Sequence, residues 1–295
     1  LGSGTGGTVR LHAPKLSPSA APAVAIKHFR ARRTNEDQDR YRRRVTQEIE
    51  LARLGGSSSP YITRVLEVFE EGGNGKWSLV TPFYPRDLFS AVVGRSIGSR
   101  LRERIFAELV SAIASLHSLG IAHRDIKLEN VCLDGEDHVK LLDFGSATRR
   151  PIQSYGLYGS DPYIAPEVIR LDDPRYEGRA YAANIADAWS LGVMWICLWR
   201  RSFAWDRATC KDSGFQAFLH HPDRVIGGFG QATDLVRPLL WVDVKERRQV
   251  LDLAESPIIA KWLTLRATSR SSSSASSSPK PSSKVPAPPA LTVGK

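Results

Sequence analysis

Side chains able to do chemistry are concentrated between residues 123 and 145. The stretch HRDIKLEN, residues 123–130, contains Asp125, Lys127 and Asn130, and Asp143 follows in the tripeptide DFG. A carboxylate can accept a proton from a hydroxyl group, and carboxylate and amide oxygens are the ligands that a hard cation such as Mg²⁺ prefers. A polar loop residue with a purely structural role is the alternative for each of them. Their close spacing makes this stretch the first candidate site.

A glycine-rich stretch opens the chain. LGSGTGGTVR places Gly2, Gly4 and Gly7 at the spacing G-x-G-x-x-G and is followed by Val9 in the same run. Glycine allows backbone N–H groups to approach an anion closely. The same spacing occurs in dinucleotide-binding turns and in ordinary linkers, so alone it is weak evidence for a phosphate-binding loop.

The hydrophobic pattern predicts a strand-rich first part and a helix-rich second part. Strand-like runs are GTVRLHA, AVAIKHF, YITRVLEVFEE and KWSLVTPFY, with one helix, DRYRRRVTQEIELARL, that ends at Gly55 and Gly56. From about Asp87 onward helices dominate, beginning with RLRERIFAELVSAIASLHSLG, which ends at Gly120. Short strands follow at VCLD and HVKLLD, then helices at ANIADAWSLGVMWICLW, GFQAFLHH and TDLVRPLLW. We therefore expect an α+β fold with a small antiparallel β lobe containing one helix, and a large, mainly helical lobe.

Five motifs occur in a defined order: the glycine-rich loop, VAIK ending at Lys27, HRDIKLEN, DFG, and APE at residues 165–167. In this order the chain resembles a eukaryotic protein kinase over roughly residues 1–265. The resemblance implies a bilobal protein kinase domain over residues 1–266. Its small lobe would span 1–84, its hinge 82–87 and its large lobe 88–266. The first strand is expected to be incomplete, since the chain starts directly before the glycines.

The resemblance also implies a role for each charged motif residue. Phosphoryl transfer needs positioning and charge neutralisation more than covalent chemistry. Lys27 is expected to contact the α- and β-phosphates of ATP. Glu48, in TQEIEL, is expected to hold Lys27 in place, because Glu50 points to a different face of the helix. A solvated strand lysine and a surface glutamate are the alternatives for these two positions.

The same resemblance makes HRDIKLEN, residues 123–130, the catalytic loop and implies a role for its polar residues. Asp125 is expected to accept or orient the proton of a substrate hydroxyl, and Lys127 to contact the transferred phosphate. Asn130 and Asp143 are expected to bind Mg²⁺. Scaffold roles are expected for Glu167, which would pair with Arg247, and for Asp187, which would hold the backbone of the catalytic loop.

The nucleotide site is outlined by the same comparison. The residues expected to line it are Gly2, Gly4, Gly7, Val9, Ala25, Lys27, Thr81, Pro82, Tyr84, Asp87 and Cys132. Thr81 falls at the gatekeeper position, and Pro82 and Tyr84 fall where backbone groups bond adenine. Proline retains the carbonyl that such a bond needs, although the family more often has glutamate there. Asp87 is expected to reach the ribose or a basic substrate residue, and Cys132 to pack beneath the adenine.

Two features indicate a serine/threonine kinase. Lys127 follows Asp125 by two residues, and Ser160 lies where such kinases place a hydroxyl against the catalytic Asp and Lys. Glu129 and Asp87 are the type of acidic pair that binds arginine upstream of the phosphorylated residue. Protein substrates with Ser or Thr in a basic context are therefore expected.

The segment between DFG and APE is the expected regulatory segment. Arg124 beside Asp125 usually implies a segment held by phosphate. The usual phosphorylated position, counted back from APE, falls on Gly156. Either a neighbour such as Ser154 serves instead, or the segment becomes ordered without phosphate. The hydroxyl groups that it offers belong to Thr148, Ser154, Tyr155, Tyr158 and Ser160.

Three segments carry a narrower resemblance. KHFRARRTNEDQDRYRRRVTQE, GSDPYIAPEV and RRSFAWDRATCKDSGFQAFL are similar to fungal kinases of the halotolerance and nitrogen-permease-reactivator group. Ala204 stands where that group usually has proline. Kinases of this group control plasma-membrane transporters, so the resemblance implies regulation of such transporters.

Composition limits the other classes. The 295 residues carry a formal net charge of +10, but the basic cluster at 30–44 lacks the aromatic interleaving of single-strand binders, so no nucleic-acid partner is expected. Peripheral attraction to acidic membranes stays open.

The sequence also indicates where the protein acts. No apolar run reaches membrane-spanning length, and no secretory signal is visible. The three cysteines lack metal-ligand spacing, so a cytoplasmic location is expected. Residues 267–295, rich in Ser and Pro, are expected to be a disordered tail.

Two other readings remain as alternatives. A pseudokinase or a truncated, inactive scaffold would have the same fold. A pseudokinase is expected to lack at least one motif residue. This chain retains all of them: Lys27, Asp125, Asn130 and Asp143. A small-molecule kinase of related fold rarely carries an APE segment followed by a full helical insert. The sequence does not indicate an oligomeric state.

Overall fold

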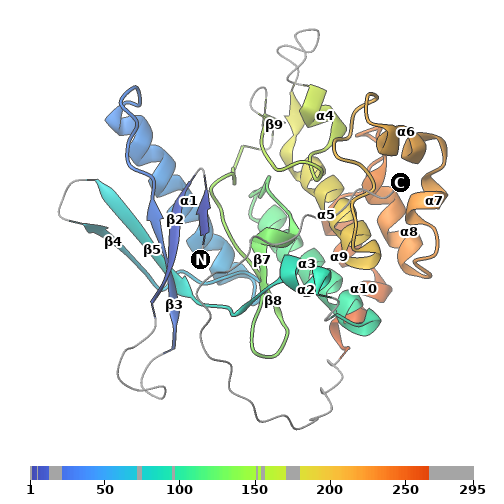
Figure 1. Ribbon diagram of the computed structural model, residues 1–295, viewed down its shortest axis with the longest axis horizontal. Coiled ribbons are helices and arrows are strands. Elements are labelled where there is room, and N and C mark those ends of the chain that lie inside the picture. Colours follow the sequence, from blue (N-terminus) through green and yellow to red (C-terminus); the bar gives the residue numbers. More distant parts are fainter. Residues whose placement is uncertain are drawn as a thin grey trace.

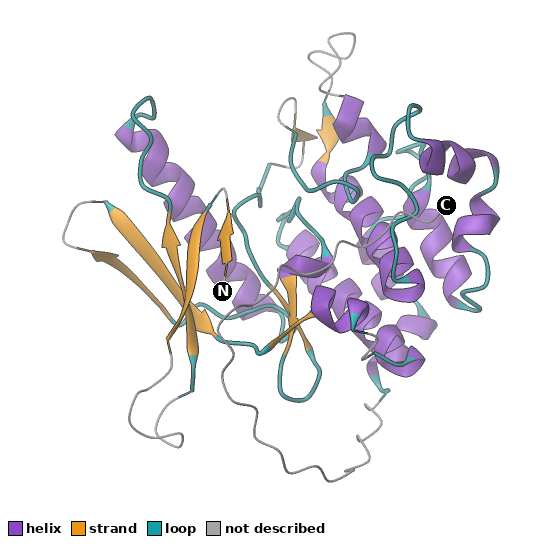
Figure 2. Cartoon of the chain, viewed as in Figure 1, coloured by secondary structure: helices purple, strands orange, loops and turns teal. Residues whose placement is uncertain are grey.

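An antiparallel sheet and a group of helices form two lobes (Figure 1). The computed structural model describes residues 2–4, 6–12, 22–71, 75–94, 97–150, 152–153, 157–170 and 180–265. The tail expected at 267–295 and Gly156 lie outside the described residues. Figure 2 shows the longer strands gathered in one lobe and most helices in the other. The expected α+β, two-lobe architecture is therefore present.

The small lobe is built on one sheet. Its strands are β1 (Gly2–Gly4), β2 (Gly7–His12), β3 (Val24–Phe29), β4 (Glu67–Glu71) and β5 (Lys76–Pro82), in the order β1-β2-β3-β5-β4. Every neighbouring pair is antiparallel. Lys27 lies opposite Val9 on one side and Leu79 on the other. Since directly opposite residues share a face of the sheet, these three side chains lie on the same face.

A single long helix, α1 (Gln38–Ser58), packs on this sheet. Its buried residues Tyr41, Val45 and Ile49 recur every four positions, which places them on one stripe of the helix. They form an apolar cluster with Phe29 of β3 and Leu79 of β5. Arginines occupy much of the exposed surface of the first turns, so the helix is amphipathic. This packing fixes the rotation of α1 and therefore the direction of its polar residues.

The end of α1 differs from the expectation. The helix does not end at Gly55 and Gly56 but continues to Ser58. A Cβ atom on Gly55 would lie 2.8 Å from the ring of Phe144, and one on Gly56 would lie 2.4 Å from the carbonyl oxygen of Thr63. The two glycines therefore allow close packing within a helix. They are not the helix terminator that the sequence suggested.

The strand expected over YITRVLEVFEE is also shorter than predicted, because residues 61–66 are outside β4. Tyr61 and Thr63 instead form backbone hydrogen bonds with Leu141 of the large lobe, at 2.8 and 3.0 Å. Residues 61–63 thus join the two lobes through the backbone, and pairing with β5 begins only at Leu66, whose N–H donates to the carbonyl of Val80 at 2.8 Å.

The large lobe supplies the loops that carry the motifs. Its helices are α2 (Leu88–Val93), α3 (Ser99–Ser118), α4 (Pro166–Ile169), α5 (Ala183–Arg200), α6 (Ser213–His220), α7 (Pro222–Ile226), α8 (Ala232–Val236), α9 (Val250–Ala254) and α10 (Pro257–Leu263), with 3₁₀ turns η1 (Leu128–Asn130) and η4 (Arg237–Leu240). Its strands are β6 (Arg86–Asp87), β7 (Val131–Leu133), β8 (Val139–Leu141), β9 (Ile152–Gln153) and β10 (Tyr181–Ala182). Within the described ranges no helix is both long and apolar enough to cross a membrane.

Aromatic residues fill the core of the large lobe. The Trp195 ring of α5 lies 4.7 Å from Phe106 of α3 and 5.7 Å from Trp262 of α10, measured between ring centroids.

The expected cap of α3 is present: Gly120 has a φ of 69°, and its N–H donates to the carbonyl of His117. The loop that follows α3 therefore leaves a rigid core in a defined direction.

Replacing Gly56 by alanine tests the packing role of this glycine. Alanine has a helix propensity about 1 kcal/mol better than glycine, yet the new methyl group would meet backbone, which cannot rotate away. We expect Gly56→Ala to lower the free energy of unfolding by about 1–3 kcal/mol. Thermal unfolding measures this, with Gly135→Ala as the control, because a Cβ there has no neighbour within 4 Å. A Gly56→Ala protein as stable as the wild type would contradict the packing role.

Candidate active site

The ammonium group of Lys27 lies between two carboxylates. Its Nζ atom is 2.5 Å from Oε1 of Glu48 and 2.7 Å from Oδ1 of Asp143. β3 carries Lys27, α1 carries Glu48, and the loop after β8 carries Asp143. Glu48 is buried and Glu50 is exposed, as the rotation of α1 requires. The contact therefore joins both lobes through three side chains.

These contacts shift the pKa values of Lys27, Glu48 and Asp143. Burial lowers the pKa of Lys27, but the charges of Glu48 and Asp143 outweigh burial and raise it above its ordinary value. Burial raises the pKa of Asp143, and the charge and hydrogen bond of Lys27 reverse this, so the net pKa is lowered. Burial dominates for Glu48, whose pKa is raised in spite of Lys27. Lys27 and Asp143 are thus charged at neutral pH.

The carboxylate of Asp125 is held by neighbours on both sides. Ser160 donates to its Oδ1 at 3.0 Å, and Nζ of Lys127 lies 3.0 Å from its Oδ2. Lys127 also donates to Oγ of Ser160 at 2.7 Å. The three side chains form a closed triangle that orients the carboxylate. A hydroxyl group bound beside Asp125 would meet a proton acceptor with a cation next to it.

The oxygen atoms of Asn130 and Asp143 fit a hard cation. Asn130 Nδ2 donates to the carbonyl and to Oδ2 of Asp125, at 2.8 and 2.9 Å, so its amide oxygen remains as a ligand. Asp143 uses Oδ1 for Lys27 and for the N–H of Gly145, which leaves Oδ2. Among the described residues no group of three His, Cys, Asp or Glu side chains could hold a metal. Mg²⁺ at this site would therefore need further oxygen ligands from water or a bound phosphate.

Asp187 of α5 holds the catalytic loop from beneath. Its carboxylate accepts hydrogen bonds from the backbone N–H groups of His123 and Arg124, at 2.7 and 2.8 Å, and lies 3.0 Å from Nε2 of His117. The side chain is 1% exposed. The ring of His123 packs edge-on against Phe144, with centroids 5.2 Å apart. The loop is thereby tied to the helical core and to the DFG segment.

A second scaffold contact is also present: Arg247 donates to both carboxylate oxygens of Glu167, at 2.6 and 2.9 Å.

The glycine-rich turn lies above Lys27. Gly2 and Gly4 of β1 pair with Val9 and Gly7 of β2. A Cβ atom on Gly6, which the sequence analysis did not single out, would lie 3.4 Å from Nζ of Lys27. Two consecutive glycines in the turn are the signal that could have identified it. The backbone of the turn can thus come close to an anion bound at Lys27.

Sheet register explains why proline is tolerated at the hinge. Ala25 lies opposite Thr81, and the next pair is Val24 and Pro82. The N–H of residue 83 bonds to the carbonyl of residue 23 at 3.1 Å. Hydrogen-bonded and non-bonded pairs alternate in an antiparallel ladder, so Pro82 occupies a non-bonded position. The missing N–H loses no ladder bond, and the Pro82 carbonyl does not pair with β3.

The remaining expected nucleotide residues lie just beyond the hinge. The hydroxyl group of Tyr84 lies 3.3 Å from Oγ1 of Thr63. Asp87 accepts a hydrogen bond from the N–H of Ser90 at 2.7 Å and so caps α2. Cys132 is directly opposite Asp87 in the β6–β7 ladder. Burial, with a smaller effect from the charge of Asp87, raises the pKa of the Cys132 thiol to about 12, so it remains protonated.

Glu36 is a structural residue that the sequence analysis missed. Its carboxylate lies 3.3 Å from both Arg30 and Arg44 and accepts a bond from the N–H of Arg33 at 3.2 Å. Burial raises its pKa, but the bond from Arg33 and the charge of Arg44 lower it overall. A lone glutamate within an arginine-rich run was the available signal. Glu36 ties the loop after β3 to α1, the helix that carries Glu48.

Comparison with known proteins gives one family. Residues 1–259 match the family described as protein kinase domain. The serine/threonine-protein kinase oca2 of Schizosaccharomyces pombe is 36% identical over 74% of this chain and 32% of its own length. The nitrogen permease reactivator protein of Saccharomyces cerevisiae is 30% identical over 76% of this chain and 27% of its own length. The human NUAK family SNF1-like kinase 2 is 30% identical over 86% of this chain and 38% of its own length.

The chain therefore spans about a third of the length of these relatives. The family match covers both lobes, the ion pair of Lys27 and Glu48, and the loop that carries Asp125. Sequence, fold and site geometry agree, and the chain belongs to the protein kinase domain family.

Proposed function

We propose that this domain is a serine/threonine protein kinase that transfers the γ-phosphate of ATP to a Ser or Thr hydroxyl group of a protein. The observation that carries the proposal is the position of the Asp125 carboxylate, held by Lys127, Asn130 and Ser160 within 3.0 Å. Names of relatives such as serine/threonine-protein kinase oca2 support the hydroxyl class. A scaffold without activity is the alternative, and the intact motif residues argue against it.

ATP is proposed to bind between the lobes. In this proposal the Gly2, Gly4 and Gly7 turn covers its phosphates, and Lys27, held by Glu48, contacts the α- and β-phosphates. The shared sheet face supports this, because it places Lys27 under the glycine turn. The residues proposed to enclose the adenine and ribose are Val9, Ala25, Thr81, Pro82, Tyr84, Asp87 and Cys132. The carbonyl of Pro82, unpaired with β3, is available to adenine.

The proposed transfer uses five side chains of this chain. Asp125 accepts the proton of the substrate hydroxyl as the oxygen attacks the γ-phosphorus. Lys127 neutralises charge on the transferred phosphoryl group. Asn130 and Asp143 would hold Mg²⁺, which neutralises phosphate charge when bound. Ser160 keeps the carboxylate of Asp125 and the amine of Lys127 together.

The substrate is proposed to carry arginine near the phosphorylated residue. Glu129 reaches solvent, but the neighbouring protein atoms partly desolvate its carboxylate, which is the larger cause of its raised pKa. The charges of Asp125 and Asp87 raise this pKa further. Three carboxylates at one end of the site produce a negative potential that favours a basic peptide. The printed name of one relative, nitrogen permease reactivator protein, supports membrane-transport proteins as the substrate class. The cytoplasm is the proposed place of action.

Asp125→Asn tests the enzyme. Asparagine preserves the shape of the side chain but cannot accept the proton, so kcat is expected to fall by about 10²- to 10⁴-fold. Transfer from labelled Mg-ATP to a panel of Ser-, Thr- and Tyr-containing peptides measures this, with Asp252→Asn on the exposed face of α9 as the matched control. Transfer to tyrosine alone, or full activity of Asp125→Asn, would overturn the proposal. So would a folded wild-type protein that binds ATP and transfers nothing.

Glu129→Gln tests the preference for basic peptides. Removal of one charge of the acidic group is expected to raise KM for arginine-containing peptides by about three- to tenfold, with little change for neutral peptides. Glu255→Gln, an exposed glutamate far along the chain, is the control. An equal effect of Glu129→Gln on both peptide types would show that this carboxylate does not read substrate charge.

A further inference from the structure

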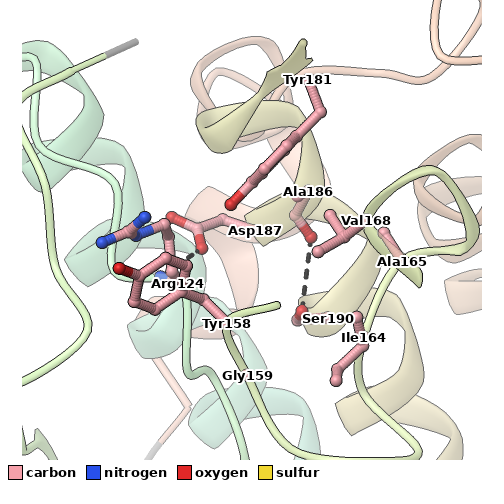
Figure 3. A pocket seen from close by; sticks show the side chains of 10 residues that line it. All are labelled: Arg124, Tyr158, Gly159, Ile164, Ala165, Val168, Tyr181, Ala186, Asp187 and Ser190. Carbon is pink, nitrogen blue, oxygen red and sulfur yellow. Dashed lines mark hydrogen bonds between the residues drawn. The ribbon is translucent and has the colours of Figure 1, made fainter. Parts of the chain in front are cut away.

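The guanidinium group of Arg124 has an aromatic neighbour. Its central carbon lies 3.7 Å from the ring centroid of Tyr158. Figure 3 shows the Tyr158 ring against Arg124, next to Asp187 of α5. A cation over the face of a tyrosine ring is attracted by the electron density of the ring. Tyr158 belongs to the segment between DFG and APE, so the contact joins that segment to the catalytic loop.

Arg124 is a rigid point of attachment. Its φ of 65° is in the left-handed region, which is unusual for a residue with a side chain. The backbone N–H of Arg124 donates to the Asp187 carboxylate at 2.8 Å, and Nε of Arg124 donates to the carbonyl of Ser146 at 2.5 Å. The guanidinium therefore touches the residue after DFG as well as the Tyr158 ring. One side chain connects the catalytic loop to both ends of the segment.

The chain then passes directly from Tyr158 to the catalytic residues. Gly159 has a φ of 107°, and a Cβ atom there would lie 3.2 Å from the carbonyl oxygen of Arg124 and 3.1 Å from the Ile164 side chain. The next residue, Ser160, bonds to Asp125 and Lys127. A shift of the Tyr158 ring would move Ser160, since only Gly159, closely packed against Arg124 and Ile164, separates them.

We propose that Tyr158 is a positioning residue, whose ring on Arg124 holds Ser160 against Asp125 and Lys127. The proposal rests on the kinase function proposed above. Phosphate transfer should then depend on the aromatic face at position 158.

Three substitutions at position 158 separate the ring from mere bulk. Tyr158→Phe keeps the aromatic face and should retain kcat within about twofold, whereas Tyr158→Leu keeps apolar bulk and should lower kcat about tenfold. KM for ATP should be unchanged, because the contacts of Lys27 lie elsewhere. Tyr158→Trp should behave like Tyr158→Phe, and Trp241→Leu, an exposed tryptophan on another surface, is the control. Equal activity of Tyr158→Leu and wild type, or equal loss in Tyr158→Phe, would overturn the proposal.

A double-mutant cycle tests the partner. In an Arg124→Gln background, Tyr158→Leu should lower kcat less than twofold, because the cation is already gone. Independent, multiplying losses would show that Tyr158 acts through another residue.

A readout without catalysis keeps this proposal distinct from the proposed function. Trypsin can cut after Arg149, an exposed residue of the same segment. Release of the segment in Tyr158→Leu should speed this cut several-fold relative to Tyr158→Phe, with an unchanged melting temperature. A wild type that is inactive but shows this difference would refute the kinase proposal alone. Equal cutting of the two variants would refute the positioning role alone.

Discussion

The pairing of one half-buried ammonium group with two carboxylates is the constraint on which the other features depend. Lys27 reaches Glu48 and Asp143 only when β3, α1 and the loop after β8 meet. A buried charge without a partner is strongly unfavourable, so the pairing couples the rotation of α1 to the position of the DFG segment. Surrounding contacts reinforce this. Glu36 fixes the start of α1, and the missing side chain of Gly55 leaves room for the Phe144 ring.

A second constraint lies beneath the site, at Asp187. Its buried carboxylate holds two successive backbone N–H groups, and this keeps the catalytic loop in a conformation that includes the positive φ of Arg124. α5, which carries Asp187, is packed by the aromatic cluster of the large lobe, so the anchor itself is rigid. Asp125, Lys127 and Ser160 can then be precisely spaced on short loops. The geometry of the site is thus set by buried polar bonds on a dense apolar core.

Much of the fold and site could be predicted from residue order, because each motif residue has a chemical role that only a few side chains can fill. Gly55 and Gly56 were misread, since a glycine that ends a helix and one that permits close packing look alike in sequence. Residues 61–63 have a strand pattern but bond to Leu141 of the other lobe, which local periodicity cannot show. The partners of Glu36 and Tyr158 depend on tertiary contacts that no spacing rule encodes.

The most direct test of this account is Mg-ATP affinity, measured by titration calorimetry on wild type, Lys27→Met, Glu48→Gln and the double variant. If Glu48 acts by holding Lys27, each single change should weaken binding by about tenfold, and the double variant should bind no more weakly than Lys27→Met. Wild-type affinity in Glu48→Gln, or losses that multiply in the double variant, would contradict the claim that this ion pair forms the nucleotide site.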